Sequence, residues 1–124
     1  SKYTLGGVGA LAYEMWEHGD SDEATRAFDY LNKNLLEKGN ANAYAWYYTM
    51  QAYFLEGGDQ WKKWNEKAMP VILNYQQPDG NFKMPGGHGP KEPVAASVYD
   101  TALCTLMLEV YYRYLPTTQK NLGR

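Results

Sequence analysis

The spacing of apolar residues along the chain predicts a protein built from helices. Apolar side chains recur every three to four positions over most of the length, and almost no stretch alternates apolar and polar residues as a half-buried strand does. Five helical segments are expected, with approximate bounds 4–18, 20–38, 42–58, 59–76 and 97–116. The fold class predicted from this pattern is all-α.

Two of the five segments are amphipathic. Segment 20–38 has Asp20 or Ser21 as its N-cap and a wet side opposite one apolar stripe. Segment 59–76 is similar, but Pro70 is expected to kink or split it, because an interior proline removes a backbone hydrogen bond. The two apolar stripes consist of Ala24, Ala27, Phe28, Leu31 and Leu35, and of Trp61, Trp64, Ala68, Ile72 and Tyr75.

The other three segments are more apolar and are expected to be enclosed. Segment 42–58 is apolar or aromatic nearly all round, and segment 97–116 is apolar on most sides. Segment 4–18 contains three glycines, which lower helix propensity but let a neighbouring helix approach closely. Its predicted apolar face is Leu5, Val8, Ala12, Met15 and Trp16.

Enclosed and wet-sided segments therefore alternate along the chain. This order is expected when helical hairpins stack with one row of helices inside and one row outside. Gly19 and Asp20 recur as Gly58 and Asp59, which is a spacing typical of helical repeats. The pattern predicts an incomplete stack of hairpin repeats within a single domain spanning residues 1–124.

Charge and composition exclude some classes of function. The net charge of −2 and the lack of a large lysine or arginine cluster argue against binding to nucleic-acid phosphates. No apolar run approaches the ~20 residues that a membrane-spanning helix needs, so a soluble protein without a membrane span is expected. The single cysteine, Cys104, has no intrachain disulfide partner and leaves the compartment open.

A short motif follows the fourth segment, in the stretch NYQQPDGNF at residues 74–82. It reads Gln76-x-x-x-Gly80-x-Phe82. Gly80 permits a positive φ in the turn, Gln76 is placed to bond backbone groups left open at the helix end, and Phe82 can pack back on the hairpin. These roles are structural, and the motif is expected to clamp the outer helices together.

With this motif and the repeat pattern, residues 42–116 resemble the terpenoid cyclase and protein prenyltransferase superfamily of α/α toroids, particularly bacterial prenyltransferase and squalene oxidase repeat proteins. In that superfamily the turn motif is Gln-x-x-x-Gly-x-Trp, and here Phe82 replaces the tryptophan. The resemblance implies an incomplete α/α toroid that looks like the C-terminal half of a complete one, in a bacterial cytoplasm or exported after processing.

The catalytic motifs of the superfamily are degraded in this chain. Squalene-type cyclases use Asp-x-Asp-Asp-Thr-Ala, where the middle aspartate delivers the proton, and this chain has Ser97-Val98-Tyr99-Asp100-Thr101-Ala102 at what looks like the corresponding helix start. Only Asp100 remains as a weak catalytic candidate, and a tyrosine with an ordinary pKa near 10 is a poor proton donor to an alkene. The alternative role of Asp100 is to cap the helix or to accept a bond from a nearby amide.

A zinc site like that of protein prenyltransferases has little support. Asp100 and Cys104 share a helix face and His88 lies in the preceding loop, but the close Asp-x-Cys spacing of that family is absent. No metal and no cofactor are therefore expected. Trp46, Tyr47 and Tyr48, together with Tyr99 and Asp100, are the candidates for lining an apolar or carbohydrate site, although aromatic core packing is the usual role of such a stripe.

The leading interpretation is a non-catalytic helical-repeat module for self-assembly or for binding a ligand or protein. An incomplete stack leaves an apolar edge, so the expected partner is a second copy or a missing N-terminal half. The alternative is a fragment of a divergent terpenoid cyclase, prenyltransferase-like or carbohydrate-active enzyme with Asp100 as a cavity acid. A water-accessible pocket carrying Asp100 and Tyr99 would favour the enzyme, and a filled core would favour the module.

Overall fold

The computed structural model describes residues 2–16, 18–34, 41–85 and 89–110. Within these residues the protein has five α-helices and no strand, which confirms the all-α prediction. The last helix was predicted to end near Pro116, a position outside the described residues. The helices are α1 (Lys2–Met15), α2 (Asp22–Asn34), α3 (Ala43–Glu56), α4 (Gly58–Leu73) and α5 (Pro93–Leu108).

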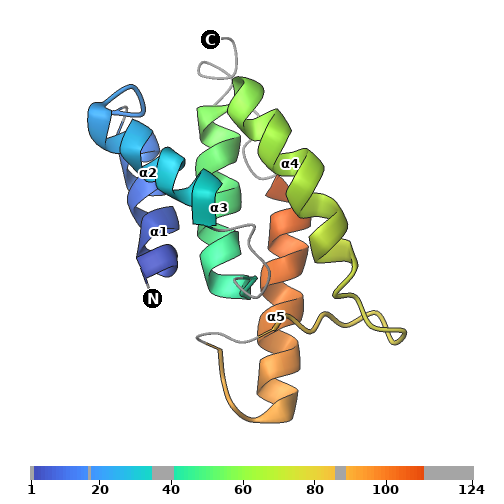
Figure 1. Ribbon diagram of the computed structural model, residues 1–124. Helices are drawn as coiled ribbons and strands as arrows, with labels where there is room; N and C mark the ends of the chain where they lie inside the picture. Colours follow the sequence, from blue (N-terminus) through green and yellow to red (C-terminus); the bar gives the residue numbers. More distant parts are fainter. Residues whose placement is uncertain (1, 17, 35–40, 86–88, 111–124) are drawn as a thin grey trace.

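Helix α3 lies at the centre of the molecule. It packs most extensively against α1 and also contacts α5 and α4, while α2 packs on α1 (Figure 1). Helices α1, α3 and α5 therefore form one row, and the two amphipathic helices α2 and α4 cover it from outside. This is the predicted alternation of helices. That such a row curves into a toroid stays a prediction.

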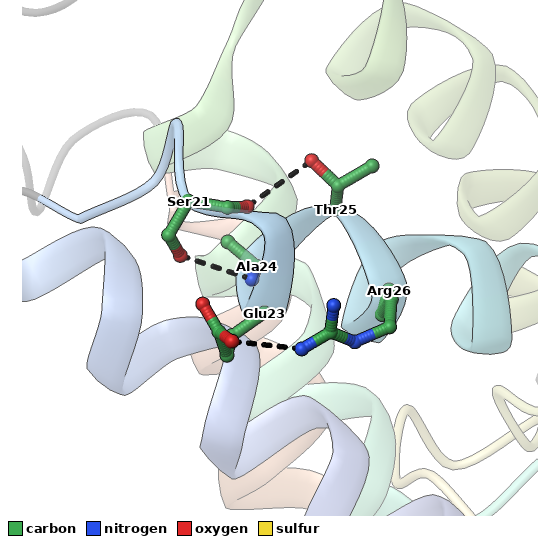
Figure 2. Close-up of polar contacts among 5 residues, drawn as sticks. All are labelled: Ser21, Glu23, Ala24, Thr25 and Arg26. Atoms are coloured by element: carbon green, nitrogen blue, oxygen red, sulfur yellow. Dashed lines mark hydrogen bonds and ion pairs between the residues drawn. The ribbon is translucent and has the colours of Figure 1, made fainter.

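The start of α2 is fixed by a hydrogen-bonded cap. The Ser21 side-chain oxygen accepts a hydrogen bond from the Ala24 amide at 3.2 Å, so Ser21 is the N-cap (Figure 2). The Thr25 hydroxyl donates to the Ser21 carbonyl at 3.2 Å, and Arg26 pairs with Glu23 at 2.8 Å on the exposed side. These local contacts explain why the helix begins where the sequence predicted.

The core is built around the aromatic residues of α3. Trp46 and Tyr53 are fully enclosed, and both rings contact Trp64 of α4. The Tyr53 and Trp64 rings stack with their centroids 4.9 Å apart, and Phe28 of α2 meets the edge of Tyr53 at the same distance. Stacked and edge-to-face pairs add about 1 kcal/mol each to the burial of the rings. The prediction that this helix is enclosed is confirmed.

The predicted apolar face of α1 is wrong. Leu5, Met15 and Trp16 are exposed, at 72%, 65% and 73% of their surface, and the buried positions are Gly7, Ala10 and Leu11. Helix α1 turns its small residues toward α3: a Cβ atom added to Gly7 would lie 2.5 Å from the Thr49 hydroxyl oxygen and 3.2 Å from the Ala45 carbonyl oxygen. The face with small residues is buried because it allows the backbones of α1 and α3 to pack closely, whereas the face with large apolar side chains is exposed.

Helix α5 also differs from expectation. It begins at Pro93, four residues before the predicted start, because proline at the first helical position loses no hydrogen bond. Within Pro93–Leu108 only Cys104 and Met107 are buried, so α5 is not enclosed. A helix at the end of a row has a neighbour on one side only, and its other side faces solvent.

Helix α4 is continuous through Pro70, so the predicted split is wrong. The proline lies in the last turn, where only one intrahelical hydrogen bond is lost. The predicted stripe is otherwise correct, since Trp64, Ala68 and Ile72 are buried. Gly58 begins α4 whereas Gly19 precedes the Ser21 cap, so the two Gly-Asp pairs do not occupy equivalent positions. No described helix combines the length and apolar character that crossing a bilayer requires.

Candidate functional site

The turn motif after α4 connects that helix to α5. Gly80 has a φ of 88°, which is the positive value predicted for it, and Phe82 is buried in the core. The Gln76 side chain donates to the Gly80 carbonyl at 3.2 Å, so it closes the turn on itself instead of bonding the open end of the helix. The motif stabilises the connection between α4 and α5. These contacts do not form the clamp between outer helices that was expected from the sequence.

Asp100, on α5, forms a hydrogen bond with the segment that connects α4 to α5. Its Oδ2 accepts a hydrogen bond from the Met84 amide at 3.0 Å, and the neighbouring Thr101 hydroxyl oxygen accepts one from the Phe82 amide at 3.0 Å. Asp100 lies about two turns after the start of α5 at Pro93, so it is not the N-cap of this helix. Burial raises the pKa of the Asp100 carboxyl, and the Met84 amide partly offsets this by favouring the ionised form. The contacts of Asp100 are those of an anchor for the loop.

The predicted aromatic candidates separate into two places. Trp46 is 2% exposed and packs in the core, where its ring meets Trp64 at 5.4 Å. Tyr47 and Tyr48 are half-buried, with their ring centroids 5.1 Å apart. Burial raises the pKa of Tyr48, with contributions from Tyr44, Tyr47 and Tyr99. These four tyrosines therefore gather where α3 faces α5, and Trp46 lies apart from them.

Tyr99 and Cys104 have pKa values that disfavour their ionised forms. Burial raises the pKa of Tyr99, with the charges of Tyr44 and Asp100 adding to it. Burial, followed by the charge of Asp100, raises the pKa of the Cys104 thiol to about 12. Without a metal, this thiol is therefore protonated at neutral pH. His88 lies outside the described residues, and among the described residues no three histidine, cysteine or acidic side chains are grouped as a metal site would require.

A second group of acids lies where α1 and α3 end. Burial raises the pKa of Glu14 to about 7, with further contributions from the charges of Glu56 and Asp20. Glu14 Oε1 is buried and has no hydrogen-bond partner among the described residues. Gly19 approaches so closely that a Cβ atom there would overlap the Glu14 carboxyl group. This carboxyl is therefore held in a place that favours its neutral form.

A groove with a different character lies between α2 and α4. Its volume is about 420 Å³, and its lining is mostly polar and charged. The lining residues are Asn32, Asp59, Gln60, Lys63, Trp64 and Lys67. One signal for this groove is visible in the sequence: Lys63 and Lys67 are spaced i, i+4 on the solvent-exposed face of α4. Asn32 comes from another helix, and only the packed structure brings it to these lysines.

The sequence comparisons add no family assignment. Searches against family models, curated proteins and solved structures return no significant match. The resemblance to toroid repeat proteins therefore depends on the residues of the chain itself.

Proposed function

We propose that this chain is a non-catalytic helical-repeat module, of the kind found in prenyltransferase and squalene cyclase toroids, which works by associating with a second copy of itself. The observation that carries the proposal is the exposure of large apolar side chains on α1 and α5, the two end helices of the inner row. Monomeric proteins rarely leave extended apolar surface in water, and such surface is typical of protein interfaces.

The exposed face of α5 is suited to a two-fold contact. Val94 and Val98 lie one turn apart and are 79% and 65% exposed, and Ala95 and Ala102 lie beside them on the exposed side. Asp100 is the one charged residue within Pro93–Leu108, and its Oδ2 is already bonded to the Met84 amide. Two copies of this face can therefore meet without burying an unpaired charge, which would cost several kcal/mol.

Helix α1 offers a second apolar face at the other end of the row. Leu5 of α1 and Trp16, the residue that follows the helix, are exposed, and a Cβ atom added to Gly9 would meet nothing within 4 Å. This face supports the same proposal, because a stack of hairpins that ends at α1 exposes the surface on which another hairpin would pack. A missing N-terminal half would cover this face in the same way as a second copy.

The enzyme alternative has one supporting observation. Burial raises the pKa of Asp100 next to Tyr99, which is a property of many catalytic acids. The loop amide on Oδ2 and the enclosure of Trp46 in the core favour the scaffold, since a small apolar or carbohydrate ligand would need these side chains to be accessible.

Light scattering and sedimentation equilibrium at tens of micromolar test the proposal. We expect a dimer for the parent chain. Val98→Lys should weaken association at least tenfold, because each buried valine contributes about 1.5 kcal/mol and the change occurs twice in a two-fold dimer. Glu66→Lys, at an exposed position of α4, is the control for added positive charge and should leave the dimer intact. A parent chain that is monomeric under these conditions rules the proposal out.

A further inference from the structure

The side chains that line the groove between α2 and α4 carry a net positive charge. Lys63 and Lys67 lie on successive turns of α4, so both ammonium groups project from the same side of the helix. Within the described residues neither lysine forms an ion pair. Asp59, in the first turn of α4, is the acidic residue among the lining side chains, so the lining carries one net positive charge.

A chain of hydrogen bonds orients the amides of the groove. The buried Tyr53 hydroxyl donates to Asn32 Oδ1 at 2.6 Å, and Asn32 Nδ2 donates to Gln60 Oε1 at 3.3 Å. Burial, with the charge of Asp29, raises the pKa of Tyr53 and keeps this hydroxyl protonated as a donor. Both amide oxygens are thus used within the protein. The Gln60 amide nitrogen remains at the end of the chain, and it can only donate.

Trp64 forms part of the groove wall and joins it to the core. Its ring stacks on Tyr53, the residue at which the hydrogen-bond chain begins. The Trp64 indole Nε1 is buried and has no acceptor among the described residues. The groove lining therefore combines two ammonium groups, an amide donor, an aromatic side chain and one acidic side chain.

We infer that this groove binds an oxyanion, such as a phosphate group, through the ammonium groups of Lys63 and Lys67 and the amide nitrogen of Gln60. The two ammonium groups would form charge-assisted hydrogen bonds with the oxyanion, which are stronger than hydrogen bonds between neutral groups. The oriented amide of Gln60 would add a neutral donor. Asp59 opposes binding and limits the affinity. The groove lies on the outer row of helices, so this site is independent of the association proposed for α1 and α5.

The test is a titration of the full chain with inorganic phosphate at pH 7 and constant ionic strength, followed by the NMR signals of the Trp64 indole and of the Gln60 and Asn32 side-chain amides. Saturable shifts are expected. Lys63→Gln and Lys67→Gln should each weaken binding about five- to tenfold, and Asp59→Asn should tighten it about threefold. Parallel titrations with acetate and with chloride separate an oxyanion site from general ion binding.

Lys62→Gln is the matched control, since Lys62 is exposed on the same helix but does not line the groove. It should change the affinity less than twofold. Saturation by phosphate alone or by both phosphate and acetate, with the expected loss in the Lys63 and Lys67 variants, supports the site. Linear shifts that are equal for phosphate and chloride overturn it, and so does an equal loss of affinity in Lys62→Gln. Circular dichroism confirms that each variant keeps its helices.

Discussion

Among single residues, Glu14 is a carboxyl group whose pKa the fold raises to near neutral pH. Its carboxyl lies between the end of α1, the turn at Gly19 and the end of α3, and burial raises its pKa from 4.5 to about 7. Glu56 and Asp20 add negative charge nearby. The folded protein therefore prefers the protonated carboxyl, whereas the unfolded chain does not.

The free energy of unfolding should consequently fall as pH rises between about 4.5 and 7. A group whose pKa is raised by folding binds its proton more tightly in the folded state, so its contribution is fully present below pH 4.5 and lost above pH 7. Glu14→Gln removes this loss and should stabilise the protein by about 1 kcal/mol at pH 8, a reduced value because water screens a half-buried group. Urea unfolding at pH 5 and pH 8 measures the effect. A variant as pH-dependent as the parent chain would contradict it.

The turn at residues 76–82 shows how far prediction reaches for individual residues. The positive φ of Gly80 and the burial of Phe82 follow from their chemistry, since glycine alone adopts that φ freely and a phenylalanine near a helix end is usually packed. The hydrogen-bond partner of the Gln76 side chain could not be predicted from the sequence. Its flexible side chain can reach several carbonyl groups, and the local shape of the turn selects the one of Gly80.

For whole helices, the packing of α1 on α3 depends on a position without a side chain. Gly7 lies against Thr49 and Ala45, whereas Gly9 on the same helix faces open space. The backbone atoms that Gly7 approaches cannot move away as the end of a flexible side chain can. The two glycines therefore provide a matched comparison within one element.

Gly7→Ala should destabilise the protein by about 1–2 kcal/mol, because overpacking against backbone exceeds the gain in helix propensity. Gly9→Ala should instead stabilise it by roughly 0.5–1 kcal/mol, since only the propensity changes. Thermal unfolding of both variants, followed by circular dichroism, measures the difference. Equal effects of the same sign would mean that α1 does not dock on α3 through its glycine face.

The end helices were predicted less well than the central ones. Periodicity identified all five helices and the buried residues Ala24, Phe28 and Leu31 of α2 and Trp64, Ala68 and Ile72 of α4, because polar residues mark the opposite side of each helix. Leu35, also predicted for the α2 stripe, lies outside the described residues. In α1 and α5 apolar residues occur on several sides, so the pattern cannot indicate which side is covered. The close approach expected at the glycines of α1 is confirmed at Gly7, but Gly7 and Ala10 were not assigned to the buried face because small residues give a weak apolar signal.

For the whole molecule, the proposed dimer links stability to protein concentration. Anything that binds the folded state alone raises the apparent Tm by mass action. A tenfold increase in concentration should raise the Tm of the parent chain by roughly 2 °C. Val98→Lys should abolish this dependence while keeping a similar Tm at high dilution, because Val98 is exposed within one chain. Differential scanning calorimetry over two decades of concentration provides the measurement, and a constant Tm for the parent chain would argue against association.

The sequence by itself determined the number and type of the helices, the enclosure of α3, the amphipathic character of α2 and α4, and the turn at Gly80. These features depend on residues near one another in the chain, whose spacing and backbone freedom are local properties. Only the tertiary structure decided that α1 turns Gly7 toward α3, that Met84 supplies the amide bonded to Asp100, and that Asn32 lines the same groove as Lys63 and Lys67. Each of these depends on which surfaces fit together, and fit is a property of two elements in contact that neither sequence segment carries alone.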